Sequence, residues 1–211
     1  MKNKILFILI NISQLAFSQI DSISYYYNKG EYKKSIKYGE LLLSYYDKKI
    51  LKKDEGFVNT LSWLSILTEK ENDTIKREKY IKLLEQNLSY CEENYKSVIQ
   101  NYYLIAKNYK TQKKYDLAED FFLKTINLSE LKNFEEEVYF YSLQLLGQIY
   151  FDQDRIILHD EEIKKNFDKQ LLISEKLYTK NSYDYAFALN NLGLYFNQKE
   201  DYERAEKYFV E

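Results

Sequence analysis

Apolar side chains recur along this chain at intervals of three and four residues, the spacing that places them on one face of an α-helix. Near the end of the chain, Leu189, Leu192 and Phe196 share one such face, and Ala205 and Phe209 share another after a short polar break. The pattern predicts two amphipathic helices joined by a tight turn, and similar pairs recur upstream. The predicted helices span about 20–29, 31–47, 54–70, 74–90, 94–112, 115–130, 134–153, 158–178, 183–198 and 202–211.

Short polar segments predict where these helices break. They lie at residues 28–30, 72–73, 111–113, 152–154 and 197–199. The chain contains no proline and only five glycines, on which turn-rich β folds depend. The sequence therefore predicts an all-α protein.

Two helix pairs share the same internal spacing, and a third has a turn about four residues longer. Gly193 precedes Tyr202 by nine residues, and Ala106 precedes Tyr115 by the same nine. A second small residue, such as Ala118, follows on the second helix. We expect these small residues to let two helices cross closely while flanking aromatic rings fill the gap to the next pair. The small residues of the first helices are Ser65, Ala106, Gly147 and Gly193, spaced by 41, 41 and 46.

This series of aliphatic, small, tyrosine, alanine and phenylalanine positions resembles the tetratricopeptide repeat (TPR) family. The match is clearest in residues 99–132 and 186–211 and weak in 45–95. The spacing resembles that of the long subtype of about 42 residues, found in kinesin light chains and many bacterial arrays, although the usual connector proline is absent near 180–183. The resemblance implies a TPR-type α-solenoid of about five helix-turn-helix pairs in a right-handed superhelix, with the last repeat incomplete.

The first residues are typical of a secretory signal peptide. Two lysines precede a short apolar run, and Ala16-Phe17-Ser18 offers a cleavage site that leaves Gln19 as the new N-terminus. A membrane anchor is the alternative, but the run is short and polar for a hydrocarbon core of about 30 Å. We expect a signal peptide at 1–18, a repeat array at 19–211 and export to the periplasm or beyond. The composition is typical of a Bacteroidetes-like bacterium.

The last predicted helix stops at Glu211 without the polar capping helix that closes such arrays. We therefore expect the chain to be a fragment of a longer protein. The alternative is that the final half-repeat is itself the end of the array.

Composition narrows the classes of function. The chain has 31 basic and 33 acidic residues, a net charge of −2, and the charges are interspersed. A nucleic-acid surface needs a concentrated basic patch, so we expect no nucleic-acid partner. Cys91 and His159 are the only cysteine and histidine, which excludes an internal disulfide and a cysteine metal cluster. No glycine-rich phosphate loop is visible.

Few local patterns could carry chemistry, and each fits a helical structure better. His159 precedes the acidic run 160–162, which is typical of a helix start. Residues 152–155, Asp-Gln-Asp-Arg, lack the glycine and distal glutamate of a calcium loop. Cys91 has no catalytic partner nearby in sequence, and Trp63 fits a helix core. We expect no catalytic residue, metal site or cofactor.

The TPR resemblance also implies a binding face, because first helices in that family line a concave groove for an extended peptide or a partner helix. At matching offsets this face carries aromatic anchors, together with amides and lysines that can bond a peptide backbone or a carboxylate. The alternative is a solvated wall. The predicted partner-binding residues are Gln100, Tyr103, Lys107, Lys110, Tyr141, Gln144, Gln148, Phe187, Asn190 and Asn197, with Phe151 and Leu194 at the same offsets.

The sequence thus predicts a non-catalytic scaffold for protein–protein interaction, secreted or periplasmic, with a protein or peptide partner and no membrane span after signal cleavage. The alternative is an N-terminal input segment of a larger regulatory protein. Its output would be a membrane sensor, a transcriptional regulator or a caspase-like peptidase beyond Glu211.

Overall fold

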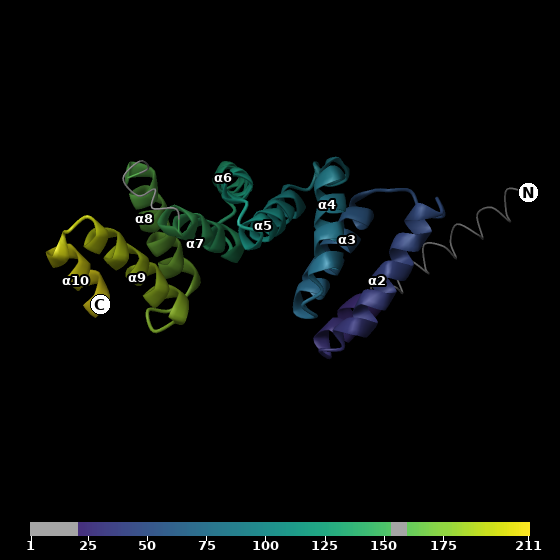
Figure 1. The fold of residues 1–211 in the computed structure, drawn as a ribbon, viewed down its shortest axis with the longest axis horizontal. Helices are drawn as coiled ribbons and strands as arrows, with labels where there is room; N and C mark the ends of the chain where they lie inside the picture. Colours follow the sequence, from purple (N-terminus) through teal and green to yellow (C-terminus); the bar gives the residue numbers. More distant parts are fainter. Residues whose placement is uncertain (1–20, 153–159) are drawn as a thin grey trace, which may run out of the picture. The chain divides into compact units, whose positions relative to one another are not determined.

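Figure 1 shows the chain in a computed structural model, which describes residues 21–152 and 160–211; the predicted signal peptide lies outside these ranges. Within them the structure is helical, without strands, and residues 21–28 form the first helix. The all-α prediction is confirmed. The following helices are α2 (Tyr32–Asp47), α3 (Glu55–Lys70), α4 (Thr74–Gln86), the 3₁₀ helix η1 (Leu88–Cys91), α5 (Tyr95–Thr111), α6 (Tyr115–Lys132), α7 (Glu137–Asp152), α8 (Asp160–Leu177), α9 (Tyr183–Gln198) and α10 (Tyr202–Val210).

The chain divides into two compact units, residues 1–104 and 105–211, with the boundary inside α5. In the first unit, α3 packs against both α2 and α4. In the second unit, each helix from α6 to α10 packs against the next one in the chain. Contacts between sequence neighbours are those of a helical repeat array, as the sequence predicts.

The close helix crossings predicted at the small residues are confirmed. A Cβ atom placed on Gly147 would lie 2.2 Å from Cε1 of Phe167, and one placed on Gly193 would lie 2.4 Å from Cε1 of Phe209. A phenyl ring of the second helix therefore lies directly against the backbone of the first. Ala106, at the matching position of another pair, is fully buried. Only a residue with little or no side chain fits beneath such a ring.

In the first helix pair, residues 21–28 and α2, the large residue of the crossing stands on the first helix and the small residue on the second. Ile23 stands where the other pairs have a small residue, and Gly39 stands where they have phenylalanine or isoleucine. Ile23 is buried, and its carbonyl oxygen accepts a hydrogen bond from Ser35 Oγ at 2.7 Å. Leu64 of the next pair fills the space above Gly39, since a Cβ there would lie 2.8 Å from Leu64 Cδ2. The crossing is filled although its two residues have changed places.

One type of turn ends most of these helices. At the end of α6, Asn133 has a φ of 51°, its N–H donates to the Glu130 carbonyl, and the Phe134 N–H donates to the Ser129 carbonyl. This pair of bonds is a Schellman motif. Among the described residues that take this left-handed conformation, Gly30 is a glycine, and the others are lysine, asparagine or glutamate. The described residues with the same positive φ and bond pattern are Gly30, Lys49, Asn72, Lys113, Asn133 and Glu200.

Carboxylates tie successive helix pairs together. Glu40 on α2 accepts hydrogen bonds from Lys76 Nζ and Tyr80 Oη on α4, each at 2.8 Å. These partners stand about one repeat away in the sequence, so the bonds join neighbouring pairs. The same set of carboxylate, tyrosine and lysine recurs as Glu130 with Tyr139 and Lys169, and as Asp160 with Tyr195 and Lys199.

These contacts change proton affinities. Burial alone would raise the pKa of Glu40, but the hydrogen bonds from Lys76 and Tyr80 lower it on balance. Burial and then the Glu40 carboxylate raise the pKa of Tyr80. Tyr46 is buried against Phe57, and burial together with the charge of Asp54 raises its pKa to about 12. The folded state therefore holds Tyr46 and Tyr80 in their protonated forms.

Two predictions about aromatic residues are corrected. Tyr202, expected to pack between helices, is 65% exposed, because it lies in the first turn of α10, one turn before the crossing at Ala205. Trp63, expected in the core, is only half-buried and meets the edge of Tyr27 with ring centroids 5.1 Å apart.

Substituting Gly147 by alanine should destabilise the protein by about 1–3 kcal/mol, because the new methyl group enters the space held by Phe167. Urea denaturation of the purified variant measures the loss. Adding Phe167→Leu to the same chain should recover part of it, since leucine lacks the ring atoms that clash. Wild-type stability of Gly147→Ala would contradict the close crossing.

The protein should lose stability in alkali. The pKa of Tyr46 rises from about 10 in the unfolded chain to about 12 in the fold, so its contribution is complete below pH 10 and disappears as the pH approaches 12. The expected loss from this residue is about 1–3 kcal/mol. Urea denaturation at a series of pH values measures it. Tyr46→Phe should flatten the curve between about pH 10 and 12, and an unchanged curve would contradict the assignment.

Candidate partner-binding face

The predicted binding residues lie on the first helices of three successive pairs. All of their side chains are exposed or half-buried, as a binding surface requires. Because the boundary between the two units falls inside α5, its residues are placed on that helix alone. We call this set the first-helix face: Gln100, Tyr103, Lys107 and Lys110 on α5, Tyr141, Gln144 and Gln148 on α7, and Phe187, Asn190 and Asn197 on α9.

The amides of the first-helix face differ from the amides of the interior. Inside the protein, Asn191 Nδ2 donates to Gln170 Oε1 at 2.9 Å, and Asn101 Oδ1 accepts from Ser62 Oγ at 2.6 Å. Both asparagines are buried. On the face, the amide groups keep their donors and acceptors for solvent or a ligand. Those without a side-chain hydrogen bond in the described part of the chain are Gln100, Gln144, Gln148, Asn190 and Asn197.

Aromatic side chains of the face are held by neighbouring groups. The Tyr141 hydroxyl donates to Asp184 Oδ1 at 3.2 Å, which joins α7 to α9. Burial raises the pKa of Tyr141, and the Asp184 charge adds to the effect. Phe187 packs against Tyr183, with ring centroids 5.9 Å apart, and Tyr183 is 77% exposed. Sequence reasoning missed Tyr183 and Asp184, although the four-residue spacing from Tyr183 to Phe187 places both rings on one helix face.

The other predicted residues present less of their surface. Lys107 and Lys110 are half-buried, and both take part in contacts within the protein. The Phe151 ring stacks on the Phe167 ring, with ring centroids 5.8 Å apart, so this ring packs within the protein and is not a ligand contact. Leu194 is 41% exposed and remains available. The face therefore combines open amides with a few exposed apolar side chains and two partly covered lysines.

Residues with catalytic potential do not assemble in the described ranges. Burial raises the pKa of the Cys91 thiol, whose Sγ donates to the Leu88 carbonyl oxygen at 3.1 Å, so the thiolate nucleophile is disfavoured. No metal-binding group of His, Cys, Asp and Glu occurs in residues 21–152 and 160–211. His159 and residues 153–155 lie outside them. Helix α8 begins at Asp160, which confirms the acidic helix start.

A cavity of about 270 Å³ lies among α6, α7 and α8. Its charged groups already bond one another, because Glu130 accepts from both Tyr139 and Lys169. This arrangement ties helices together and provides no pairing of a nucleophile with a base. The lining residues are Ser129, Glu130, Asn133, Glu135, Tyr139, Lys169, Leu172 and Ile173.

Across residues 21–152 and 160–211, every helix is too short or too polar to cross a bilayer.

Comparisons with known proteins identify the fold. No protein-family model and no curated protein matches the sequence. Among solved structures, kinesin-light-chain TPR-like repeats from Podosopora anserina are 12% identical with a TM-score of 0.70, covering 94% of this chain and 93% of that one. BtubC (BKLC) from P. vanneervenii is 15% identical with a TM-score of 0.71, covering 96% and 87%. MamA is 17% identical with a TM-score of 0.66, covering 94% and 90%. The chain therefore has the fold of TPR-like repeat proteins.

Proposed function

We propose that this protein is a non-catalytic interaction module whose second unit binds an extended peptide or a partner helix along the part of the first-helix face from Lys107 to Asn197. The observation that carries the proposal is the set of amides without side-chain hydrogen bonds on α7 and α9, which lie beside the exposed ring of Tyr183 and the half-buried ring of Phe187. The TPR-like fold supports a scaffold role, but a fold alone does not fix a function. The proposal therefore rests on the chemistry of this face.

The chemistry of the face selects the kind of ligand. Amide side chains can donate to carbonyl oxygens and accept from N–H groups of a peptide backbone, which is independent of the ligand's sequence. The exposed ring of Tyr183 and the half-buried ring of Phe187 provide anchors for apolar side chains of the ligand. Lys107 and Lys110 favour a carboxylate at the α5 end. We expect a peptide or helix with apolar side chains and an acidic residue.

We propose further that the protein acts after export, with residues 1–18 removed as a signal peptide. The support is the charged start, the short apolar run and the small residues before Gln19. N-terminal sequencing of the protein recovered from its native host should begin at Gln19. A chain that retains Met1 would contradict export by this route.

A photo-crosslinking side chain at Asn190 should capture a discrete protein adduct in native-host extract, because Asn190 is exposed at the centre of the face on α9. The matched control places the same group at Lys165, which is exposed on the second helix α8. Gel mobility and mass spectrometry identify the adducts. Equal capture from both positions, or none from Asn190, would contradict the proposed face.

The charge reversal Lys107→Glu should weaken this adduct while changing the free energy of unfolding by less than about 1 kcal/mol. Reversal at Lys165 should leave the adduct intact. Urea denaturation separates a loss of binding from a loss of folding. A Lys107→Glu variant that folds and still yields the full adduct would remove the lysines from the ligand site.

A further inference from the structure

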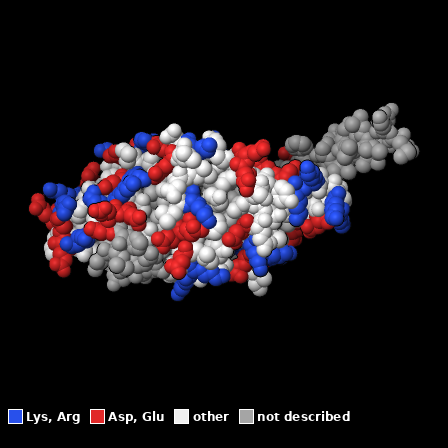
Figure 2. Space-filling view, turned by 90° about the horizontal axis from the view of Figure 1, so that it is seen from above, with Lys and Arg blue, Asp and Glu red and all other residues white. Residues whose placement is uncertain are grey.

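Positive charge is concentrated in one segment of the chain. Residues 29–53 contain eight lysines, three acidic residues and no arginine, a net charge of +5 in a chain whose net charge is −2. Two lysine pairs in this segment flank Ile50 and Leu51, and we call residues 48–53, Lys-Lys-Ile-Leu-Lys-Lys, the basic loop. Figure 2 shows several blue side chains over the part of the first unit that holds α2.

The basic loop is held at both ends. At its start, Lys49 has a φ of 58°, and the Ile50 N–H donates to the Tyr45 carbonyl at 2.8 Å, which closes the Schellman motif of α2. At its end, the Asp54 side chain caps α3 by accepting from the Phe57 N–H at 3.3 Å. The positions of the lysines are therefore fixed by the helices on either side.

The lysines of the loop lack acidic partners. Lys48, Lys49 and Lys52 are exposed and form no ion pair in the part of the chain that the structure describes. Lys53 lies over the Phe57 ring at 4.4 Å. Several other lysines are paired, as Lys176 is with Glu135 and Lys33 is with Glu71. The loop thus presents uncompensated charge, which attracts an anionic surface.

An apolar side chain stands at the centre of this charge. Ile50 occupies the position after the left-handed residue of its Schellman motif, where an apolar side chain usually packs against the helix. Phe134, at the same position after α6, is 5% exposed, whereas Ile50 is 43% exposed. Ile50 is therefore presented to the outside by a rigid turn, between two pairs of lysines.

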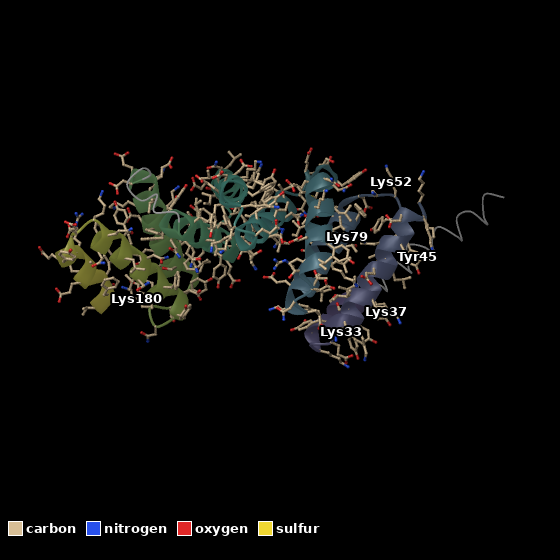
Figure 3. The ribbon with its side chains drawn as sticks, viewed as in Figure 1. Lys33, Lys37, Tyr45, Lys52, Lys79 and Lys180 are labelled. Carbon is tan, nitrogen blue, oxygen red and sulfur yellow. The ribbon has the colours of Figure 1, made fainter. Side chains whose placement is uncertain are left out.

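The outer face of α2 continues this surface. Lys33, Lys37 and Leu41 follow one another by one helical turn and so share a face, and Leu41 is 39% exposed. Figure 3 shows Lys33, Lys37 and Tyr45 along α2 and Lys52 in the loop that follows. We call Lys33, Lys37, Leu41 and Tyr45 the α2 stripe. Charge and apolar surface alternate from this stripe into the basic loop.

We propose that the basic loop and the α2 stripe dock the protein on the surface of a lipid bilayer with anionic headgroups, with Ile50 entering the interface. Lysine-rich segments are attracted to anionic bilayers, and an exposed aliphatic side chain gains by leaving water there. Nucleic acid is disfavoured, since the surface has no arginine for bidentate phosphate contacts and Ile50 would face charged phosphates. An acidic protein is disfavoured because Lys48, Lys49 and Lys52 are all exposed and extend over a convex turn with an exposed aliphatic side chain between them.

Sedimentation of the protein with vesicles tests the proposal. Vesicles of mixed phosphatidylcholine and phosphatidylglycerol should bind it at low ionic strength, and pure phosphatidylcholine vesicles should not. The double variant K48E/K49E should lower the partition coefficient at least about 25-fold, since each lysine near an anionic surface contributes roughly fivefold. Ile50→Ser should lower it about fivefold through the lost apolar contact.

A matched control reverses another lysine pair in a turn between two helices. Lys113 has the same φ of 58° as Lys49, and Lys114 follows it, so K113E/K114E makes the same change in charge at another left-handed turn. This variant should change the partition coefficient less than about threefold, because Lys113 and Lys114 are not part of the proposed bilayer contact. Thermal unfolding of both variants shows whether each remains folded, and the Asn190 adduct, which tests the first-helix face, should survive both.

Three outcomes would overturn the proposal. The first is a wild-type protein that does not sediment with phosphatidylglycerol vesicles. The second is an equal loss of vesicle binding in K48E/K49E and K113E/K114E, which would indicate general charge attraction. The third is binding to poly-glutamate or to single-stranded DNA, sensitive to K48E/K49E, in the absence of vesicle binding. That result would assign the surface to an acidic protein or to nucleic acid instead.

Discussion

The fold depends on one steric constraint, the close crossing of two helices within each pair. Phe167 lies against the backbone of Gly147, and Phe209 lies against that of Gly193, at distances that leave no room for a methyl group. Such contact brings the two helices close enough to exclude water without a long loop or a disulfide. A pair closed in this way still exposes apolar surface, which the next pair covers, so the array follows from the crossing.

Polar groups at the helix ends and between neighbouring pairs align the pairs with one another. Schellman turns satisfy the carbonyl groups at the helix ends, and residues such as Lys49 and Glu200 serve in them although each bears a side chain in the left-handed region. The carboxylate of Glu40 spans to the next pair and bonds a tyrosine and a lysine there. These groups are partly exposed, so they contribute little to the free energy of folding and act mainly by aligning neighbouring pairs.

Much of the fold could be predicted from the sequence because its rules are local. Helix limits follow from periodicity and polar breaks, and the crossing at Gly193 follows from a fixed offset. The exposure of Tyr202 could not be predicted, since it depends on what packs beside the first turn of its helix. The bond from Tyr141 to Asp184 could not be predicted either, because it joins side chains about one repeat apart. The sequence correctly predicted that the residues of the candidate site lie on solvent-accessible helix faces. The total charge of −2 gave no sign of the excess of lysines in residues 29–53.

The exchanged crossing of the first pair has a consequence for how such a gene can change. Recombination that moved a single helix between pairs would place Ile23 and a phenylalanine at the two positions of one crossing and overfill it, since the other pairs keep one of these positions small. Duplication or loss of a whole pair preserves both partners of the crossing. The helix pair is therefore the smallest unit of inheritance in this array, and breakpoints that survive selection should fall between pairs.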